Sequence, residues 1–376
     1  MLNHLKKKQN VKVFLSSFFF HLDDWREKYK QDMMNDPLPY GYQWAEDDNL
    51  SITYIEADSF EKRWFSRIPI LKKIYPFLSL PFKVNRNDII WTHYDKDALA
   101  IALYKKIPIL KHRMPKQISC FVWLLDNYRE YKPLKKKIIS WLLKSIDKII
   151  FHAKTEKNLF KNYFGIDSKH LQYVPFGINI SSYSEGDIIP LDVPTPFVLS
   201  VGTDKHRDLD MLVEIANHFE GKINFIFATA NISFAHEMRE HKNITVVKAN
   251  LKEIRWLYEN SILVIVPLKY NEHVSGCTTV LETAARRKPI IITKVPGMDD
   301  YVLDRETGFM VEVGDKKGFI TAIEDLLNNP GKRKYMGETA FQYIQEKQFT
   351  TKRWANDHKK ITYELIGFSD QTFGGD

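Results

Sequence analysis

Two glycine-containing turns in the second half of the chain carry residue types that hold phosphate. In FVLSVGTDKHRDLDMLVEIA, Gly202 ends an apolar run and Arg207 precedes an amphipathic one. In NEHVSGCTTVLETAARRKPII, Gly276 precedes two threonines and Glu282. Glycine lets the backbone approach a ligand, a helix N-terminus attracts anions, and a carboxylate accepts hydrogen bonds from a diol. The alternatives are a plain strand-to-helix turn and a surface ion pair between Glu282 and Arg286.

Shorter patterns bear on cofactors and metals. The sequence contains neither GxGxxG nor GxxxxGK[ST], so neither a dinucleotide fingerprint nor a P-loop is predicted. D-x-D patterns begin at Asp95 and Asp208, but both fall at predicted helix starts, and no metal site is expected. With Cys120 and Cys277 as the two cysteines, a disulfide framework and a metal site built on thiolates are excluded, and a reducing compartment is expected.

Two polar residues in the first half are candidate catalytic groups. His93 lies in WTHYD, and Asp126 directly follows the apolar run 121–125. Because the carboxyl ends of parallel strands face the ligand crevice of an open α/β sheet, both side chains are placed to reach it. As a general base, Asp126 would remove the proton of an acceptor hydroxyl. The alternatives are a packed histidine at 93 and, for the neighbouring Asp95, a helix N-cap.

The elements that must position these residues follow an α/β pattern in both halves. Short β-branched or aromatic runs alternate with amphipathic stretches of helical length, which indicates parallel sheets with crossover helices. Strands are expected at residues 11–15, 52–55, 88–92, 118–124, 148–153, 197–201, 223–228, 244–248, 262–268, 289–293 and 308–311. Helices are expected at residues 98–106, 134–144, 156–164, 209–219, 252–260, 278–287 and 316–328.

A chain of 376 residues is long enough for two such domains. Prolines, a glycine and acidic residues break both periodicities at 181–196, which predicts a linker. The expected domains are residues 1–185 and 192–350, and a final helix at 351–366, within the segment 351–376, is expected to cross back to the first domain. No run of 18 apolar residues and no cleavage site after the apolar run 11–20 are present, so neither a membrane span nor a signal peptide is predicted.

The order of these motifs resembles one enzyme family. The PFGIN segment at 175–179, the VGTDKHRD turn, the helix with Glu282 and the VPG segment at 295–297 are together similar to the C-terminal half of GT-B glycosyltransferases. The closest likeness is to the retaining family 4, also called glycosyltransferase group 1, and it covers about residues 150–350. The resemblance implies two doubly wound, Rossmann-like domains that face each other across a cleft. It also implies a nucleotide-diphosphate sugar as donor, with UDP favoured, and no obligatory metal or cofactor.

Residue by residue, the resemblance implies a donor site. Arg207 stands where the family has a phosphate-binding Lys or Arg, and Glu282 matches the glutamate that binds the ribose. Two positions depart from the family pattern: Val274 stands where the first glutamate of E-x7-E belongs, although Glu272 lies nearby, and Thr203 replaces the arginine after the glycine. The implied donor-binding residues are Gly202, Thr203, Arg207, the base-reading Lys248, Ala249 and Asn250, the loop residues Ser275, Gly276, Cys277, Thr278 and Thr279, and Glu282.

The sequence leaves open whether the sugar is transferred with inversion or with retention of its anomeric configuration. Asp126 resembles an aspartate at a comparable strand end in xanthan-type glucuronosyltransferases, where a general base leads to direct displacement and inversion. The likeness to family 4 favours retention.

Charge is distributed unevenly along the chain and bears on partners. Of the net charge of +8, residues 1–190 carry +10, and residues 105–161 alone carry +11 with aromatic side chains interleaved. Residues 64–84 add aromatics, aliphatics and four cations. An apolar face with a basic fringe favours a peripheral position on an anionic membrane. A solvated basic surface over a buried core, or binding of single-stranded nucleic acid, are the alternatives, and the absence of a nucleic-acid motif disfavours the latter.

The sequence therefore predicts a glycosyltransferase that moves a sugar from a nucleotide-diphosphate donor to a saccharide or lipid-linked acceptor. The predicted setting is cell-surface polysaccharide or glycolipid biosynthesis at the cytoplasmic face of the cell membrane. A non-catalytic GT-B subunit that binds a partner, and a protein that binds or glucosylates nucleic acid, are the alternatives.

Overall fold

The computed structural model describes residues 8–230, 238 and 241–368, and the chain divides into two compact units. The first unit comprises Met1–Glu27, Pro37–Pro175 and Thr351–Asp376, and the second comprises Lys28–Asp36 and Phe176–Thr350. The predicted boundary at 186–191 therefore falls inside the second unit, and the final helix belongs to the first. Residues 369–376 of the predicted C-terminal segment lie outside the described residues.

The first unit is built on a six-stranded parallel sheet in the order β2-β1-β3-β4-β5-β6. Its central strands are almost wholly buried, as expected for a parallel sheet covered on both faces. The strands are β1 (Gln9–Phe14), β2 (Leu50–Tyr54), β3 (Ile89–Thr92), β4 (Lys116–Cys120), β5 (Lys148–Phe151) and β6 (Leu171–Tyr173).

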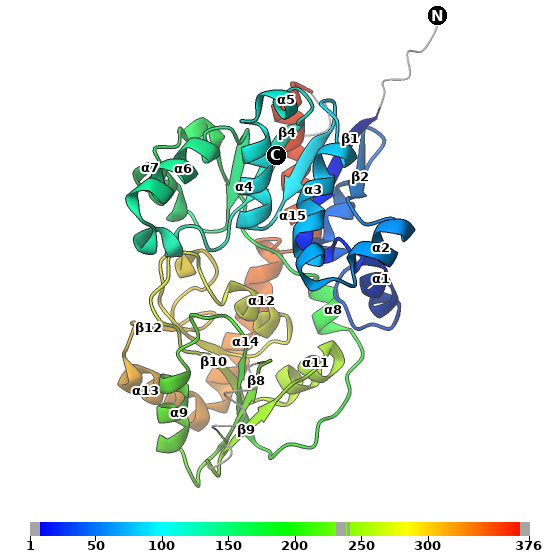
Figure 1. Ribbon diagram of the computed structural model, residues 1–376. Coiled ribbons are helices and arrows are strands. Elements are labelled where there is room, and N and C mark those ends of the chain that lie inside the picture. Colours follow the sequence, from blue (N-terminus) through cyan, green and yellow to red (C-terminus); the bar gives the residue numbers. More distant parts are fainter. Residues whose placement is uncertain (1–7, 231–237, 239–240, 369–376) are drawn as a thin grey trace, which may run out of the picture. The chain divides into compact units, whose positions relative to one another are not determined.

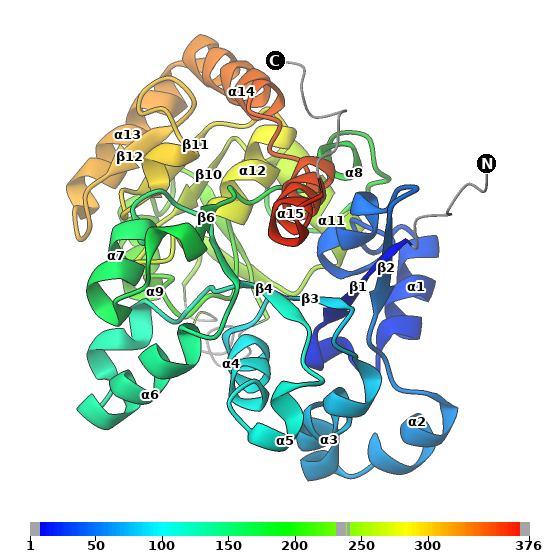
Figure 2. The ribbon, with the colours of Figure 1, turned by 90° about the horizontal axis from the view of Figure 1, so that it is seen from above.

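Alternate side chains of this sheet pack on two different layers. Phe14, Ile90 and Phe151 join cores with the helices α3, α4, α6 and α7 on one face. The opposite face meets α15, where the Trp91 indole donates to the Thr362 hydroxyl at 3.1 Å, so the layers lie on opposite sides (Figure 2). The helices are α1 (Leu22–Lys30), α2 (Ser59–Phe65), α3 (Pro69–Lys83), α4 (Asp95–Tyr104), α5 (Pro108–Lys111), α6 (Pro133–Leu143), α7 (Glu156–Phe164) and α15 (Thr351–Ile366), and the 3-10 turns are η1 (Ser16–Phe18), η2 (Pro39–Ala45), η3 (Asp126–Glu130) and η4 (Ser168–His170).

The second unit repeats the architecture with a parallel sheet in the order β12-β11-β10-β7-β8-β9. Figure 1 labels four of its strands, β8, β9, β10 and β12, and the helices α9 and α13. Helices α9 and α13 pack on one face of this sheet around Ile215, Phe319 and Ile323. The strands are β7 (Phe197–Val201), β8 (Asn224–Ala228), β9 (Ile244–Val247), β10 (Leu263–Val266), β11 (Ile290–Thr293) and β12 (Phe309–Val311). The helices are α8 (Ile180–Ser184), α9 (Leu209–His218), α11 (Leu251–Asn260), α12 (Cys277–Ala285), α13 (Lys316–Asn328) and α14 (Pro330–Glu346), with the 3-10 turn η6 (Met298–Asp300).

Local sequence signals explain where several helices begin. Asp208 caps α9 by accepting from the Met211 amide, and Asn250 forms a capping box with Glu253 at the start of α11. The α/β class and the alternating elements are confirmed. Among the described residues, no helix is long and apolar enough to cross a membrane.

The structure corrects three details of the predicted pattern. The strand expected at 118–124 ends at Cys120, because the chain turns there and Asp126 begins η3. The predicted linker opens with α8, since the Asn179 side chain caps a short helix at Ile180. The helices α1, α2, α3, α5 and α14 and the strand β6 were not predicted from the sequence. Two internal prolines obscured α3, and β6 is only three residues long.

Candidate functional site

The strongest candidate site lies at the carboxyl ends of β7 and β10 in the second unit. These neighbouring strands flank the point where the strand order reverses, which is where open α/β sheets bind ligands. The two loops that leave the strands are tied together by backbone hydrogen bonds from Asp208 N to Pro267 O at 3.0 Å and from Lys269 N to His206 O at 2.8 Å. Both predicted glycine turns are therefore brought to one place.

Arg207 lies between these loops and is buried, with 7% of its surface exposed. Its Nη2 donates a hydrogen bond to Thr279 Oγ1 at 2.9 Å, whereas Nε and Nη1 have no partner among the described residues. Burial lowers the pKa of Arg207, and the Asp204 carboxylate opposes that shift. An arginine nevertheless stays charged, so two buried N–H donors of a cation are left for an anionic ligand.

The two glycines provide the space around this guanidinium. Gly202 has φ +140°, and a Cβ there would lie 2.5 Å from both Nε and Nη2 of Arg207. Gly276 has φ +90°, and its Cβ would meet Ile292 Cδ1 at 3.1 Å. A larger residue at either position would adopt a backbone conformation that L-residues disfavour, and at 202 it would also displace the arginine.

The loop before α12 is strained and polar. Val274 is fully buried at φ +50°, which is unusual for a β-branched residue. The Ser275 amide donates to Asn271 Oδ1 at 3.0 Å, and the buried Ser275 Oγ has no partner among the described residues. Gly276 is the N-cap of α12 and has no side chain to cap the helix. The helix N-terminus is therefore open to an acceptor such as a phosphate oxygen.

An acid and two histidines meet beside this loop, and of these Asp204 and His273 were not predicted from the sequence. Asp204 Oδ1 lies 3.0 Å from His206 Nδ1, and its Oδ2 lies 3.4 Å from His273 Nε2. Burial raises the pKa of the Asp204 carboxyl, but the hydrogen bonds and charges of His273 and His206 outweigh burial and hold it well below its ordinary value. The only available signal was that all three positions lie in the two glycine turns.

Glu282, on the second turn of α12, has both carboxylate oxygens engaged. Tyr183 of α8 donates to Oε1 at 2.5 Å, and Tyr258 of α11 donates to Oε2 at 2.7 Å. Burial raises the pKa of Glu282, and the two tyrosine hydrogen bonds counter it. The alternative ion pair with Arg286 is not formed, because Arg286 bonds Glu259 at 2.5 Å. No sequence pattern pointed to either tyrosine.

The remaining predicted donor residues lie at the edges of this site or apart from it. Thr203 and Thr278 are exposed, and Cys277 is the partly exposed first residue of α12. Lys248, Ala249 and Asn250 follow β9, the outermost strand. The Asn250 side-chain oxygen Oδ1 accepts from the Lys252 and Glu253 amides, so this side chain already serves as a helix cap.

The candidate catalytic residues of the first unit are placed differently from the expectation. His93 directly follows β3 but is buried, with its ring stacked on Tyr40 at 3.6 Å and its Nδ1 3.2 Å from Tyr42 Oη. Burial, followed by the nearby His152 and His358, lowers the pKa of His93 well below its ordinary value. Asp126 is partly exposed in η3, six residues beyond the end of β4.

Two neighbouring acids lie in the first turn of α4, whose N-cap is Tyr94 and not Asp95. Asp95 Oδ1 accepts from the Val122 amide at 2.9 Å and so links the loops after β3 and β4. Asp97 is fully buried and accepts from the Ser16 amide at 3.0 Å. Burial raises the pKa of Asp97 to about 6.

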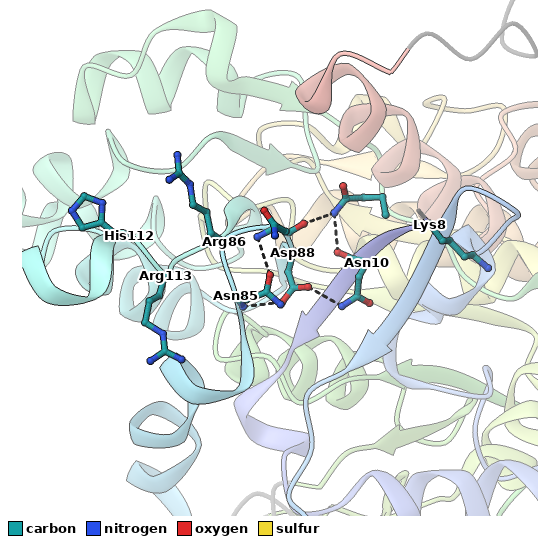
Figure 3. A pocket seen from close by; sticks show the side chains of 9 residues that line it. Lys8, Asn10, Asn85, Arg86, Asp88, His112 and Arg113 are labelled. Atoms are coloured by element: carbon teal, nitrogen blue, oxygen red, sulfur yellow. Dashed lines mark hydrogen bonds between the residues drawn. The ribbon is translucent and has the colours of Figure 1, made fainter. Parts of the chain in front are cut away.

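A pocket of about 700 Å³ in the first unit lies at the other edge of its sheet (Figure 3). It surrounds the amino ends of β1 and β3, where Asp88 accepts from Asn10 Nδ2 at 2.8 Å and from the Asn85 amide at 2.9 Å. These polar groups satisfy one another, and the sticks of Arg86, His112 and Arg113 extend away from them. Since ligands of open α/β sheets bind at the carboxyl edge, this pocket is not the candidate site.

Several known proteins are similar to this chain or to parts of it. Residues 191–343 match the family described as glycosyl transferases group 1. The capsular polysaccharide biosynthesis glycosyltransferase CapM of Staphylococcus aureus is 31% identical over 111 residues, which are 29% of this chain and 28% of that protein. The N-acetyl-alpha-D-glucosaminyl L-malate synthase of Bacillus anthracis is 29% identical over 99 residues, 26% of each chain. The matched segments thus span little more than a quarter of these relatives.

Among solved structures, HepE from Anabaena in complex with UDP and glucose is similar over 96% of this chain and 100% of its own, with a TM-score of 0.68 and 13% identity. At this identity the likeness concerns the fold. The chain has the GT-B fold, with two α/β units on parallel sheets.

Proposed function

We propose that this chain, a GT-B protein whose residues 191–343 match the group 1 glycosyltransferases, transfers a sugar from a nucleotide-diphosphate donor to a saccharide or lipid-linked acceptor. The observation that carries the proposal is the Arg207 guanidinium, buried between two glycine turns with Nε and Nη1 unpartnered among the described residues. A buried cation with unused donors at a topological switch point suits a diphosphate.

In this proposal, the diphosphate binds Arg207 and the amino end of α12 from Gly276 to Thr279. Both neutralise the charge that develops on the leaving group, so the reaction needs no metal at this site. Glu282 accepts from the ribose diol, with Tyr183 and Tyr258 holding its carboxylate in place. The diphosphate and the sugar lie along Ser275, Cys277 and Thr278. The phosphates also contact Gly202 and Thr203. The base is bound by Lys248, Ala249 and Asn250.

UDP is the proposed nucleotide, because HepE, which shares the fold, was solved with UDP and glucose. CapM supports a role in capsular or other cell-surface polysaccharide biosynthesis.

We assign proton transfer from the acceptor hydroxyl to Asp126 rather than to His93. Asp126 is partly exposed and able to meet an acceptor, whereas His93 is buried beneath Tyr40. If Asp126 is the base, the variant Asp126→Asn should lose turnover but still bind the nucleotide. The product of the wild-type enzyme should then have inverted configuration at the anomeric carbon. A retained configuration, which the group 1 likeness favours, together with unchanged turnover of the variant would remove Asp126 as the base.

The acceptor is proposed to lie at an anionic membrane surface, at the inner face of the cell membrane. On α3, the side chains of Ile70, Ile74, Leu78 and Phe82 are exposed at successive i,i+4 positions, with Phe82 76% exposed. Residues four apart share one helical face, so they form a continuous apolar stripe. Lys72 and Lys73 are exposed on the same helix, and Arg113 lies 5.9 Å from the Phe82 ring. An apolar stripe with a basic fringe suits anionic lipid.

Vesicle flotation tests this surface. Wild-type protein should float with vesicles that contain anionic phospholipid and remain below with purely zwitterionic ones. The double change Leu78→Gln and Phe82→Gln should weaken binding roughly tenfold or more, because each buried aliphatic or aromatic side chain contributes about 1.5–3 kcal/mol. Tyr335→Gln, at an exposed position of the second unit, is the matched control. Indifference to lipid charge would defeat the membrane proposal without affecting donor binding.

A thermal-shift screen against UDP, GDP, ADP and dTDP sugars tests the proposed function itself. A donor at a hundredfold excess over its dissociation constant should stabilise the fold by about 2.7 kcal/mol. Glu282→Ala and Arg207→Ala should remove most of that shift. If no nucleotide sugar shifts the transition, the chain is instead a non-catalytic GT-B subunit.

A further inference from the structure

Three metal-binding side chains outside the proposed donor site meet in the first unit. His93 follows β3, Cys120 is the last residue of β4, and His152 follows β5. The three strands are neighbours in the sheet. Because side chains alternate along a strand, Ser119 and Phe151 point to the layer of α4, α6 and α7, while Cys120 and His152 point to the opposite layer with Trp354 of α15.

The distances within this cluster suit a single metal ion. One ligand atom from each of the three side chains lies within 4.8 Å of the other two, and Cys120 Sγ is 3.0 Å from His152 Nε2. Zinc bonds of about 2.0–2.3 Å in a tetrahedral site place neighbouring ligand atoms roughly 3.3–3.8 Å apart. Small adjustments of buried side chains would therefore close the site. All three residues are buried.

The second ring nitrogens are held as in metal-bound histidines. His152 Nδ1 lies 3.2 Å from the Val174 carbonyl oxygen, and His93 Nδ1 lies 3.2 Å from Tyr42 Oη. When Nδ1 carries the proton and donates it to these oxygens, Nε2 keeps its lone pair for a metal. A backbone carbonyl or similar acceptor on the second nitrogen is the usual support of a ligating histidine.

A further imidazole, that of His358 on α15, has one ring nitrogen without a partner among the described residues. His358 Nδ1 lies 2.9 Å from the Trp354 carbonyl oxygen, and its Nε2 is buried with no hydrogen-bond partner in the described part of the chain. Its ring centre is 5.0 Å from Tyr42 and 4.3 Å from Trp354, and the Trp354 ring is 5.1 Å from His152. A buried acceptor without a donor calls for an ion or water.

We propose that His93, Cys120 and His152, with His358 beside them, form a buried site for a zinc(II) ion. One thiolate with imidazoles is a typical zinc donor set, and deprotonated Cys120 would offset part of the ion's charge. The ion would tie the ends of β3, β4 and β5 to α15, and it is separate from donor binding. The two cysteines of the chain led to the prediction that a metal site built on thiolates is absent. A mixed site of imidazoles and one thiolate needs only one cysteine.

Metal binding by the full chain, without activity as the readout, tests this proposal. Chelator-stripped protein should take up about one equivalent of zinc and unfold at a higher temperature when loaded. With cobalt(II) it should develop a thiolate-to-metal charge-transfer band. Cys120→Ser should abolish that band, and His152→Gln should lower zinc affinity at least tenfold in competition with a chromophoric chelator. Cys277→Ser, at the other cysteine, and His112→Ala, at an exposed histidine, should bind as the wild type does.

The cobalt spectrum of the wild type is decisive even if a variant fails to fold. Folded, stripped protein that binds far less than one equivalent of zinc and shows no thiolate band would overturn the proposal. Cys120 would then be a thiol that donates to His152, a hydrogen-bonded pair without metal. Unchanged stoichiometry and an unchanged band in Cys120→Ser would overturn it as well.

Discussion

The two units differ in the unpaired polar groups that lie nearest to their candidate ligand sites. In the second unit, two nitrogens of the buried Arg207, Nε and Nη1, have no partner among the described residues. In the first unit, Asp97 Oδ1, which follows β3, and His358 Nε2 of α15 are buried acceptors without a partner in the described part of the chain. Free donors suit an anion, and free acceptors suit a proton or a cation. Two sheets of similar architecture thus suit ligands of opposite charge, because the fold does not by itself specify the chemistry of the residues around it.

The most sensitive test of this contrast is Arg207→Gln. The substitution removes the charge and the two unused donors, each worth about 1.5–3 kcal/mol when bonded to an anion. Donor affinity, measured by calorimetry with the nucleotide sugar found in the thermal screen, should fall about a hundredfold or more. Arg305→Gln, at an exposed arginine of the same unit, should bind normally. If the two variants bind the nucleotide sugar with equal affinity, Arg207 is not part of its binding site.

The first unit should respond to pH instead, through Asp97. Its pKa is about 6 in the folded protein against an ordinary value of 3.8, so the native state holds the proton more tightly than the unfolded chain. The contribution of Asp97 to the free energy of unfolding should therefore be fully present below about pH 4 and be lost as the pH rises to about 6, by up to roughly 3 kcal/mol. Asp97→Asn should flatten this slope in urea titrations, whereas the exposed Asp24→Asn should leave it. If the free energy of unfolding of Asp97→Asn still falls over this pH range, another titratable group causes the dependence.

Gly202→Ala should weaken donor binding without unfolding the protein. A Cβ at 2.5 Å from the guanidinium and a backbone at φ +140° force either the loop or Arg207 to move. An affinity loss of about ten- to fiftyfold is expected, since strain at such positions costs roughly 1–3 kcal/mol. Gly331→Ala, in α14 with no atom near the new methyl group, should be neutral or slightly stabilising. Wild-type affinity in Gly202→Ala would show that the turn does not position Arg207.

The smallest effect is expected from Tyr258→Phe. It removes one hydrogen bond to Glu282 while preserving the packing of a buried ring. The pKa of Glu282 should rise further, and nucleotide-sugar affinity should fall about three- to tenfold, consistent with about 1 kcal/mol for one hydrogen bond. Tyr335→Phe, at an exposed tyrosine, is the control. If the two variants bind equally, Glu282 does not depend on its tyrosines.

The sequence by itself determined the class of fold and the two glycine turns. Alternating apolar runs and amphipathic stretches are local signals, because a strand or helix must repeat its buried face with its own period. That is why β7, α9, α13 and α15 lie within a residue or so of their predicted bounds. A boundary is misjudged where the apolar run continues past the element, as at β4, where it extends beyond the last paired residue.

Only the tertiary structure decided which side chains meet. Tyr183 and Glu282 are 99 residues apart, and Cys120 and His152 are 32 apart, so no local pattern connects them. The order and register of the strands bring His93, Cys120 and His152 to one layer, and the reversal of strand order places Arg207 beside Thr279. Burial then left the Arg207 donors unpaired and raised the pKa of Asp97 to about 6. These are properties of the packed neighbourhood, which depends on contacts between distant segments rather than on the period of any one of them.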